Sequence, residues 1–522
     1  MIIGSRTAPM RRAKALAIVV GAAAAVAAFD GRPAGLVRAD ETPAAQTIYV
    51  DQRIDATCAT YNAATRTCAG GRAAGYKTIA AAAAAAGPGS TVLLRGGLYR
   101  EPLVPANSGT ASQPITFRNY DREAAIITDV SDAPAVQLIG RAFIVIEGLT
   151  IRKSLGWGRL QEAHDNVLRG MTFLEATAPG TTGSVKVVRS WFNRIVDSTF
   201  NDGNDEIVLQ DGSAGNVISG NSFVEGHHSE LSIRCANANV VRGNTFANER
   251  QKAIEIYDCE GVSDAPVRLD ATKRNVIEDN HFGPIRGSWR PGNYDGIQHS
   301  GQYTIVRRNV FSHALAGGVT FAYYAQEALY VYGNRLYNNT FYENRCFALD
   351  GADARDSRFR DNRVVNNLFF RNGNCDGRGD QISVPDRSTI ILTNNAVLQT
   401  DPQFVDAAHD DLRLAPTSPL VDRGVALTTT VDAGEGTTMK VADPMYFYDG
   451  FKIPGEHGDD IQLMGSDATA RVTSIDYAAR TLTLDRPLTW SAKQGVALKY
   501  AGAAPDIGAY ELGAPAPRPP KQ

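Results

Sequence analysis

The chain has 522 residues, of which 43% are hydrophobic and 49 are glycine. This length is sufficient for one extended repeat domain together with a small additional domain. The formal net charge is only −3, and such a balance argues against nucleic acid as the main partner.

Residues 1–28 have the pattern of a secretory signal peptide. A basic segment from Arg11 to Lys14 precedes an apolar run from Ala15 to Ala28, which ends in small residues suited to cleavage. A membrane anchor is the alternative, but a run of about 14 residues is too short to span a bilayer comfortably. We therefore expect a secreted or periplasmic protein without a membrane span, and a disordered leader over residues 29–46.

The segment after this leader contains the first strands and one helix. Strands are expected from Ile48 and from Thr91, and the alanine-rich stretch from Ala80 to Ala86 between them is expected to form a short helix. A solenoid must cover its open end. We interpret the helix as part of an N-terminal cap on a repeat domain that extends over residues 47–427.

Eight copies of one sequence pattern run through the middle of the chain. Each copy begins with Asn or Thr, continues with apolar residues and ends with Phe, and successive closing Phe residues are 23 to 36 positions apart. A period of this size indicates a repeat architecture in which one unit cannot bury its apolar face alone. The strands are short and β-branched with no helical segment between them, so we predict an all-β fold, a parallel β-helix solenoid. The copies are Asn166–Phe173, Asn193–Phe200, Asn216–Phe223, Asn239–Phe246, Asn275–Phe282, Thr304–Phe311, Asn334–Phe341 and Asn362–Phe369.

The winding of such a solenoid explains the residue types in the pattern. Val and Ile are expected to point inward and to stack on the same position of the next coil, about 4.8 Å away. Asn at a corner tolerates left-handed backbone and can hydrogen-bond to its counterpart in the next coil.

The six cysteines fall into three close pairs. The second and third pairs are 24 and 29 residues apart, which is about one coil, so stacking would bring their sulfur atoms together. An even number of cysteines in an exported chain favours three disulfides, and the Cys-x-x-Cys spacing of zinc sites is absent. The pairs are Cys58/Cys68, Cys235/Cys259 and Cys346/Cys375.

The sequence changes character near its C-terminus. Alternating strands separated by turn residues, as in a small antiparallel barrel, are expected between residues 428 and 500. Residues 501–512 then form a closing segment, and residues 513–522 a disordered tail. We interpret 428–500 as a small β-barrel-like module inserted before the end of the solenoid.

Three segments together resemble secreted right-handed parallel β-helix proteins of the pectate-lyase-like superfamily. They are the opening Gly87–Glu101, the repeated coils that end in Phe, and the ending formed by Asp401–Asp406 and Asp506–Glu511. The resemblance covers nearly all of the mature chain apart from the inserted module, and it implies a right-handed coil. Polysaccharide lyases, epimerases, glycoside hydrolases and adhesins share this fold, so the fold does not decide the chemistry.

Superposing the repeats predicts which side chains face outward. If Ile207/Leu209, Leu231/Ile233 and Ile254/Ile256 face inward, strict alternation places three columns outside. The columns are Glu206/Glu230, Ser232/Glu255 and Gln210/Arg234/Tyr257, with Gln298 continuing the last one and His299 nearby. A solvated sheet face with salt-bridged side chains is the alternative interpretation of this strip.

Ser229–Phe246 is similar to the core motif of the alginate lyase and chondroitinase B family. Glu230 matches the Glu of that motif, whereas Arg234 stands where the family has its catalytic Lys. The next coil has Tyr257-Asp-Cys and lacks the Arg-His-Gly of the family. The resemblance therefore implies either a divergent lyase that uses Arg234 and Tyr257 or a site that has been lost.

These considerations give one set of candidate residues. A lyase must neutralise a uronate carboxylate, remove the proton at C5 and assist the leaving oxygen. Clustered carboxylates could also hold Ca²⁺. We expect Arg234, Tyr257 and His299 to be catalytic, Glu206, Gln210, His228, Lys252 and Gln298 to bind substrate, and Glu230, Glu255 and Asp258 to hold a possible Ca²⁺ ion.

Three hypotheses follow for the function. The first is a monomeric polysaccharide lyase that acts on an acidic, uronate-containing glycan by β-elimination. The second is a hydrolase or epimerase on the same scaffold, in which two carboxylates act as acid and base. The third is a surface protein that binds glycan without cleaving it.

Overall fold

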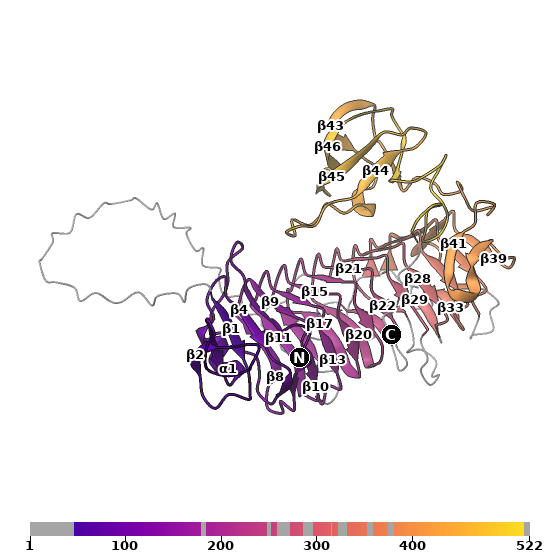
Figure 1. The fold of residues 1–522 in the computed structure, drawn as a ribbon. Helices are drawn as coiled ribbons and strands as arrows, with labels where there is room; N and C mark the ends of the chain where they lie inside the picture. Colours follow the sequence, from indigo (N-terminus) through magenta and orange to yellow (C-terminus); the bar gives the residue numbers. More distant parts are fainter. Residues whose placement is uncertain are drawn as a thin grey trace, which may run out of the picture. The chain divides into compact units, whose positions relative to one another are not determined.

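The structure is a computed structural model that describes residues 46–178, 184–247, 252–257, 272–284, 296–314, 316–321, 331–351, 359–373 and 381–515. The β-helix consists of three sheets whose strands pair in parallel, apart from one antiparallel pair at the N-terminal end, and each coil of the chain contributes one strand to each sheet in turn. Successive coils stack in sequence order, so the colour in Figure 1 changes gradually from β4 (Thr91–Leu94) to β39 (Ala396–Leu398). The predicted parallel β-helix is therefore confirmed.

The three sheets have fifteen, twelve and ten strands. In spatial order, the fifteen-stranded sheet contains β2 (Cys58–Tyr61), β3 (Ala73–Tyr76), β1 (Thr47–Val50), β4 (Thr91–Leu94), β6 (Ile115–Asn119), β9 (Ile144–Glu147), β12 (Val167–Arg169), β15 (Arg194–Val196), β18 (Val217–Ser219), β21 (Val240–Arg242), β24 (Val276–Glu278), β27 (Ile305–Arg307), β31 (Arg335–Tyr337), β35 (Asn362–Val365) and β38 (Ile390–Thr393). The twelve-stranded sheet contains β5 (Gly97–Tyr99), β7 (Ala125–Thr128), β10 (Thr150–Arg152), β13 (Thr172–Leu174), β16 (Thr199–Asn201), β19 (Ser222–Phe223), β22 (Thr245–Phe246), β25 (His281–Phe282), β28 (Val310–Ser312), β32 (Thr340–Tyr342), β36 (Leu368–Phe370) and β39 (Ala396–Leu398). The ten-stranded sheet contains β8 (Pro134–Ile139), β11 (Gly156–Gln161), β14 (Val185–Val188), β17 (Gly203–Gln210), β20 (Gly226–Arg234), β23 (Lys252–Tyr257), β26 (Ile297–His299), β29 (Gly317–Phe321), β33 (Phe347–Asp350) and β37 (Ile382–Ser383).

The interior of the coil is a continuous stack of apolar side chains. The eight Phe residues that close the repeats form one column, in which neighbouring ring centroids are 4.5 to 4.9 Å apart. Each ring is fully buried, so the column supplies both apolar burial and ring stacking. The repeated Phe of the sequence thus marks the core position of the twelve-stranded sheet.

Asparagine ladders bind the coils together at their corners. In one ladder the Nδ2 atoms of Asn221, Asn244 and Asn280 each donate to the Oδ1 of the next coil at 3.0 Å, and each of these Oδ1 acceptors also binds a backbone N–H of the preceding coil. The predicted hydrogen bonds between corner asparagines are confirmed. The ladder asparagines are not left-handed, however: that conformation falls on the residue before each of them, such as Gly220, Gly243 and Asp279.

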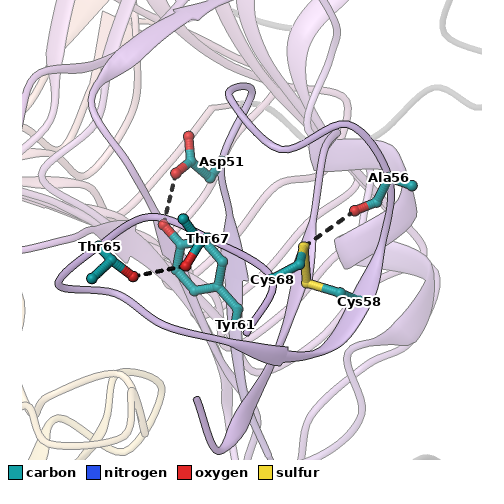
Figure 2. Close-up of a disulfide and its surroundings, with 7 residues drawn as sticks. All are labelled: Asp51, Ala56, Cys58, Tyr61, Thr65, Thr67 and Cys68. Atoms are coloured by element: carbon teal, nitrogen blue, oxygen red, sulfur yellow. Dashed lines mark hydrogen bonds between the residues drawn. A yellow bond between two sulfur atoms is a disulfide. The ribbon is translucent and has the colours of Figure 1, made fainter. Parts of the chain in front are cut away.

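The N-terminal end of the coil carries the predicted helix, α1 (Ile79–Ala85). The Thr78 hydroxyl caps the helix by accepting from the N–H of Ala81, and Ile79 is buried against the first coils. Beside it the Cys58–Cys68 disulfide closes a loop in which the Tyr61 hydroxyl donates to Asp51 (Figure 2).

The described residues test only part of the cysteine prediction. The Cys58–Cys68 disulfide is confirmed. Cys235 and Cys346 are also disulfide-bonded, but their predicted partners, Cys259 and Cys375, lie outside the described residues. The same holds for the signal peptide and for the leader up to residue 45. Among the residues that the structure describes, no helix is long and apolar enough to cross a membrane.

A six-stranded antiparallel sheet forms near the C-terminus, where the inserted module is expected. Its strands, in spatial order, are β42 (Thr428–Thr429), β47 (Gly495–Leu498), β44 (Asp460–Leu463), β45 (Thr469–Asp476), β46 (Thr481–Trp490) and β43 (Gly434–Lys440). After β47 the chain returns to the β-helix, since the Asn338 side chain donates to the carbonyl of Asp506 and the N–H of Ala509 donates to Thr340. The remaining elements are β30 (Val331–Tyr332), β34 (Phe359–Arg360), β40 (Phe404–Asp406), β41 (Asp411–Leu414) and the 3₁₀ helices η1 (Ala407–His409) and η2 (Pro444–Tyr446).

Charged side chains join this module to the fifteen-stranded sheet. Arg307 of β27 is fully buried and binds Asp459 of the module through both terminal nitrogens, at 2.6 and 2.8 Å. Glu456 accepts from Arg194 and Arg242, each at 2.9 Å. The module therefore covers part of the outer face of this sheet, and the outer face of the ten-stranded sheet is a separate surface.

Candidate active site

The longest strands of the ten-stranded sheet, β17 and β20, lie next to each other, and β23 follows. Parallel pairing places Leu209 beside Ile233, and Ile233 beside Ile256, and all three side chains are fully buried. The neighbouring positions face outward, as the alternation of a strand requires. Two predicted columns are confirmed by the register: Ser232/Glu255 and Gln210/Arg234/Tyr257.

The third predicted column, Glu206/Glu230, does not face outward. Both side chains are fully buried, and their position in the next coil is taken by Ala253, a member of the apolar core. The register of β17 and β20 shifts between Gly203 and Asp205. This irregularity places two consecutive residues inside, 206 and 207 in β17 and 230 and 231 in β20, so strict alternation fails at this point.

The same irregularity turns three other side chains outward. Asp205 pairs with Ser229, and Ser229 pairs with Lys252, so the three residues form a column on consecutive coils. Lys252 was expected from the sequence to bind substrate, whereas Asp205 and Ser229 were not expected in the site. We call the six ionisable residues that meet here the Arg234 cluster: Asp205, His228, Arg234, Lys252, Glu255 and Tyr257.

Glu255 is the centre of this cluster. Its Oε1 accepts hydrogen bonds from the Lys252 ammonium and from the Tyr257 hydroxyl. Its Oε2 accepts from the Ser229 hydroxyl at 3.2 Å and lies 3.6 Å from Nη2 of Arg234. Both oxygens of a fully buried carboxylate are thus occupied by donors, as a buried charge requires.

Asp205 is the second buried carboxylate of the Arg234 cluster. Its Oδ2 accepts from Nη2 of Arg234 at 2.6 Å, and its Oδ1 lies 2.7 Å from Nδ1 of His228. A carboxylate bound to Nδ1 favours the tautomer with its proton there and leaves Nε2 as the basic nitrogen. The Arg234 guanidinium lies 5.5 Å from the centroid of the Tyr257 ring.

Exposure divides the cluster into two layers. The Asp205, Glu255 and Lys252 side chains are 0, 0 and 3% exposed, whereas those of Arg234 and His228 are 20 and 24% exposed. Tyr257 is also partly exposed. The groups that a ligand can reach are therefore a guanidinium, an imidazole and a phenol, and the carboxylates lie beneath and orient them.

The structure does not bring His299 into this site. His299 pairs with the inward Ile256, is 1% exposed, and its ring centroid lies 5.5 Å from that of Phe321. Burial lowers the pKa of the imidazole to about 3, so it is neutral at physiological pH. The catalytic role expected for His299 therefore conflicts with its position in the core.

The remaining predicted residues are also placed by the register. Gln298 pairs with Glu255 and continues the Ser232/Glu255 column, not the Arg234/Tyr257 column to which the sequence alignment assigned it. Gln210 lies beside Arg234 in the preceding coil, as expected, and donates to Asp211 at 3.2 Å.

The residues expected to hold Ca²⁺ do not form one site. Glu230 points into the core. Glu255 lies on the other side of the strand, and its carboxylate oxygens accept hydrogen bonds from Lys252, Tyr257 and Ser229. Asp258 lies outside the described residues. No group of three or more His, Cys, Asp or Glu side chains arranged to hold a metal ion occurs within the described part of the chain.

A family model for the right-handed β-helix region matches residues 134–267 and 193–369. The matched coils thus resemble a right-handed β-helix, which is the handedness that the sequence resemblance implies. It is similar to the uncharacterized protein YwoF of Bacillus subtilis (strain 168), with 26% identity over 432 residues that cover 66% of this chain and 87% of that protein.

Two solved structures are among those to which this chain is similar. Pectate lyase Pel9A has a TM-score of 0.43 at 12% identity, covering 90% of this chain and 97% of its own. The PL6-family polysaccharide lyase Pedsa3628 from Pseudopedobacter saltans has a TM-score of 0.41 at 14% identity, covering 66% of this chain and 96% of its own. With TM-scores below 0.5, these likenesses carry no argument about the activity of this chain, so the chemistry is argued from the site.

Proposed function

We propose that the protein binds an acidic, uronate-containing polysaccharide at the Arg234 cluster and cleaves it by β-elimination. The observation that carries this proposal is the layering of the cluster. Two buried carboxylates, Asp205 and Glu255, orient a partly exposed guanidinium, imidazole and phenol. Cationic and proton-transferring groups at the surface suit an anionic sugar.

Each exposed group has a role in the elimination. Arg234 binds the uronate carboxylate and stabilises the negative charge that develops when the C5 proton leaves. His228 accepts that proton at Nε2, since Asp205 holds the opposite ring nitrogen. The electrons of the C5–H bond form the C4–C5 double bond, the bond from C4 to the glycosidic oxygen breaks, and Tyr257 protonates the departing oxygen.

Hydrolysis fits the same residues less well. A glycoside hydrolase needs two carboxyl groups that reach the glycosidic oxygen and the anomeric carbon. Asp205 and Glu255 are fully buried, and their oxygens are bound to Arg234, His228, Lys252 and Tyr257. This arrangement favours elimination over hydrolysis.

The test is the ultraviolet absorbance of 4,5-unsaturated products when the purified protein is incubated with a panel of uronate polymers. His228→Gln and Tyr257→Phe are expected to lower the rate by about 100-fold or more, the usual contribution of a general acid or base. His227→Gln is the matched control, because His227 lies on the same strand and its Nε2 contacts Asp202, a residue outside the Arg234 cluster.

Parallel reactions with added Ca²⁺ and with EDTA test the expected role of calcium. Polymer that is bound but left intact by the unaltered protein would overturn the elimination in favour of a glycan-binding protein. New reducing ends without ultraviolet absorbance would indicate hydrolysis instead. Equal rates for the His227 and His228 variants would remove His228 from the mechanism.

A further inference from the structure

The outward column that contains Ser232 and Glu255 continues toward the N-terminal coils. Lys186 of β14 pairs with Val208 of β17, and Arg159 of β11 pairs with Lys186. Both cations lie between buried neighbours of the coil interior, Leu160 next to Arg159 and Val187 next to Lys186, so their side chains face outward. Two positive charges therefore precede the Arg234 cluster on the same face of the ten-stranded sheet.

These two cations differ from most charged side chains of the described coils in their lack of a salt bridge. In the described part of the chain, neither Arg159 nor Lys186 forms an ion pair, and the side-chain contact of Arg159 is a hydrogen bond from Nε to Gln161 at 2.8 Å. Other partly exposed arginines on neighbouring coils are paired: Arg169 binds Glu147 at 2.7 Å and Arg189 binds Glu162 at 3.0 Å. Arg159 and Lys186 thus differ from these two arginines, whose charges are neutralised.

The positive charges of this column act on one another. Lys186 is partly exposed, and its pKa is lowered first by burial and then by the positive charges of Arg159 and Arg234, against a smaller opposite effect of Asp205 and Asp211. Like charges in neighbouring positions are destabilising unless a counter-charge is present. An anionic ligand lying along the column would supply this counter-charge.

We propose that Arg159 and Lys186 form an anion-binding subsite for further acidic units of the polysaccharide that occupies the Arg234 cluster. This inference rests on the proposed function and adds the direction in which the polymer lies: across the strands, from the cluster toward β11. Adjacent strands are about 4.8 Å apart, so Lys186 lies about 10 Å before Arg234 along the coil axis. The bound groups are sugar carboxylates or sulfate esters, which share the same anionic chemistry.

Uncharged hydrogen-bonding side chains border the column. Gln137 pairs with Arg159 in the preceding coil, and Gln161 and Gln210 lie two positions beyond the column on β11 and β17. Amide side chains both donate and accept hydrogen bonds, so they suit the hydroxyl groups of a sugar ring. A free inorganic anion has no hydroxyl groups or sugar ring for these amides to bind, so we assign the surface to a polymeric glycan.

Binding of uronate oligosaccharides of increasing length, followed by calorimetry, tests the subsite. Lys186→Met and Arg159→Gln are each expected to raise Kd by about tenfold for long oligosaccharides, as for the loss of one charge-assisted hydrogen bond. The effect on the shortest oligosaccharide that fills the cluster should be small. Arg189→Gln is the matched control, because Arg189 follows β14 but is neutralised by Glu162.

Thermal unfolding provides a second measurement that a structural role would not reproduce. Because Lys186→Met removes a repelled charge, the free variant should be at least as stable as the unaltered protein while it binds more weakly. A sulfated polymer and a neutral polymer are compared with the polyuronate. Weaker binding of either anionic polymer by the two variants, with no change for the neutral one, supports the subsite and identifies the anion.

Several results would overturn the subsite. The first is an unchanged affinity for long oligosaccharides in both variants, and the second is an equal loss of affinity in the Arg189 control. The third is binding of single-stranded nucleic acid that is tighter than glycan binding and depends on Arg159 and Lys186. Failure of the proposed cleavage can be distinguished from failure of the subsite. A protein that binds polyuronate through Lys186 and Arg159 but yields no unsaturated product keeps the subsite and loses the lyase activity.

Discussion

Glu206 and Glu230 place two carboxyl groups on adjacent coils inside the β-helix, and full burial raises the pKa of both well above the usual range. The charge of Glu206 raises the pKa of Glu230 further. Neither oxygen of Glu230 has a hydrogen-bond partner in the described part of the chain. Both groups are therefore protonated in the folded protein at a pH where they are ionised in the unfolded chain.

Stability should consequently fall as pH rises above the pKa of an unfolded Glu, about 4.3, because the unfolded state then loses protons that the folded state keeps. The contribution is fully present below that pH and is lost as pH rises toward the folded pKa. Each pKa unit of difference corresponds to about 1.4 kcal/mol. Glu206→Gln and Glu230→Gln, which mimic the neutral acid, should raise the unfolding midpoint at pH 8 and have little effect at pH 4.

Unfolding midpoints of both variants across this pH range check the prediction. Glu147→Gln serves as the control, since Glu147 is a partly exposed residue that forms an ion pair with Arg169. If the Gln variants are destabilised at pH 8 by more than the control, the two carboxyl groups are ionised and a bound cation or water compensates them.

Lys252 and Glu255 form a buried ion pair at the base of the Arg234 cluster. Removing one partner leaves the other charge buried, which typically costs about 3–5 kcal/mol. We expect Lys252→Met and Glu255→Gln each to reduce the free energy of unfolding by this order, and the double variant to lose less than the sum. A double-mutant cycle from urea unfolding measures this coupling, and additive losses would mean that the two side chains do not interact.

The sequence predicts the fold of this protein better than its site. The Phe column, the asparagine ladder and the pairing of Arg234 with Tyr257 follow from repeated residues, because each coil presents the same side chain at the same position. Asp205 and Ser229 were missed because the irregularity in β17 and β20 breaks the period of two on which their placement depended.

One sequence signal could have corrected this error. The position of Glu206 and Glu230 is occupied in later coils by Ala253 and Gly296, and a Cβ added at Gly296 would lie 2.7 Å from the core ring of Phe311. Small residues at equivalent positions indicate an inward, crowded column. The exposure of an acid cannot be inferred from its charge alone when its neighbours in other coils are alanine and glycine.

The Asn244 side chain makes four hydrogen bonds within the corner ladder. Its Oδ1 accepts from the N–H and the Nδ2 of Asn221, and its Nδ2 donates to the carbonyl of Ile218 and to Oδ1 of Asn280. Asn244→Ala leaves buried donors and acceptors without partners, at about 1–3 kcal/mol for each. We expect a large loss of stability in urea unfolding. Asn395→Ala, at the less buried end of the ladder, should cost distinctly less, and equal losses would show that the ladder bonds do not decide the effect.

Arg307 joins the inserted module to the β-helix through a fully buried network. It donates to Glu278 of β24 at 2.7 Å, to the Tyr337 hydroxyl at 2.9 Å and to both oxygens of Asp459. Arg307→Met leaves Asp459 without the guanidinium that binds both of its oxygens, which should cost about 3–5 kcal/mol, whereas Glu278 keeps Arg242 and Arg308 as partners. Because the network crosses between the two parts, limited proteolysis should release the module more readily in this variant. Arg486→Met is the control: it alters an exposed ion pair within the module and should leave both the proteolysis rate and the unfolding midpoint unchanged. If both variants are cleaved at the same rate, Arg307 does not hold the module in place.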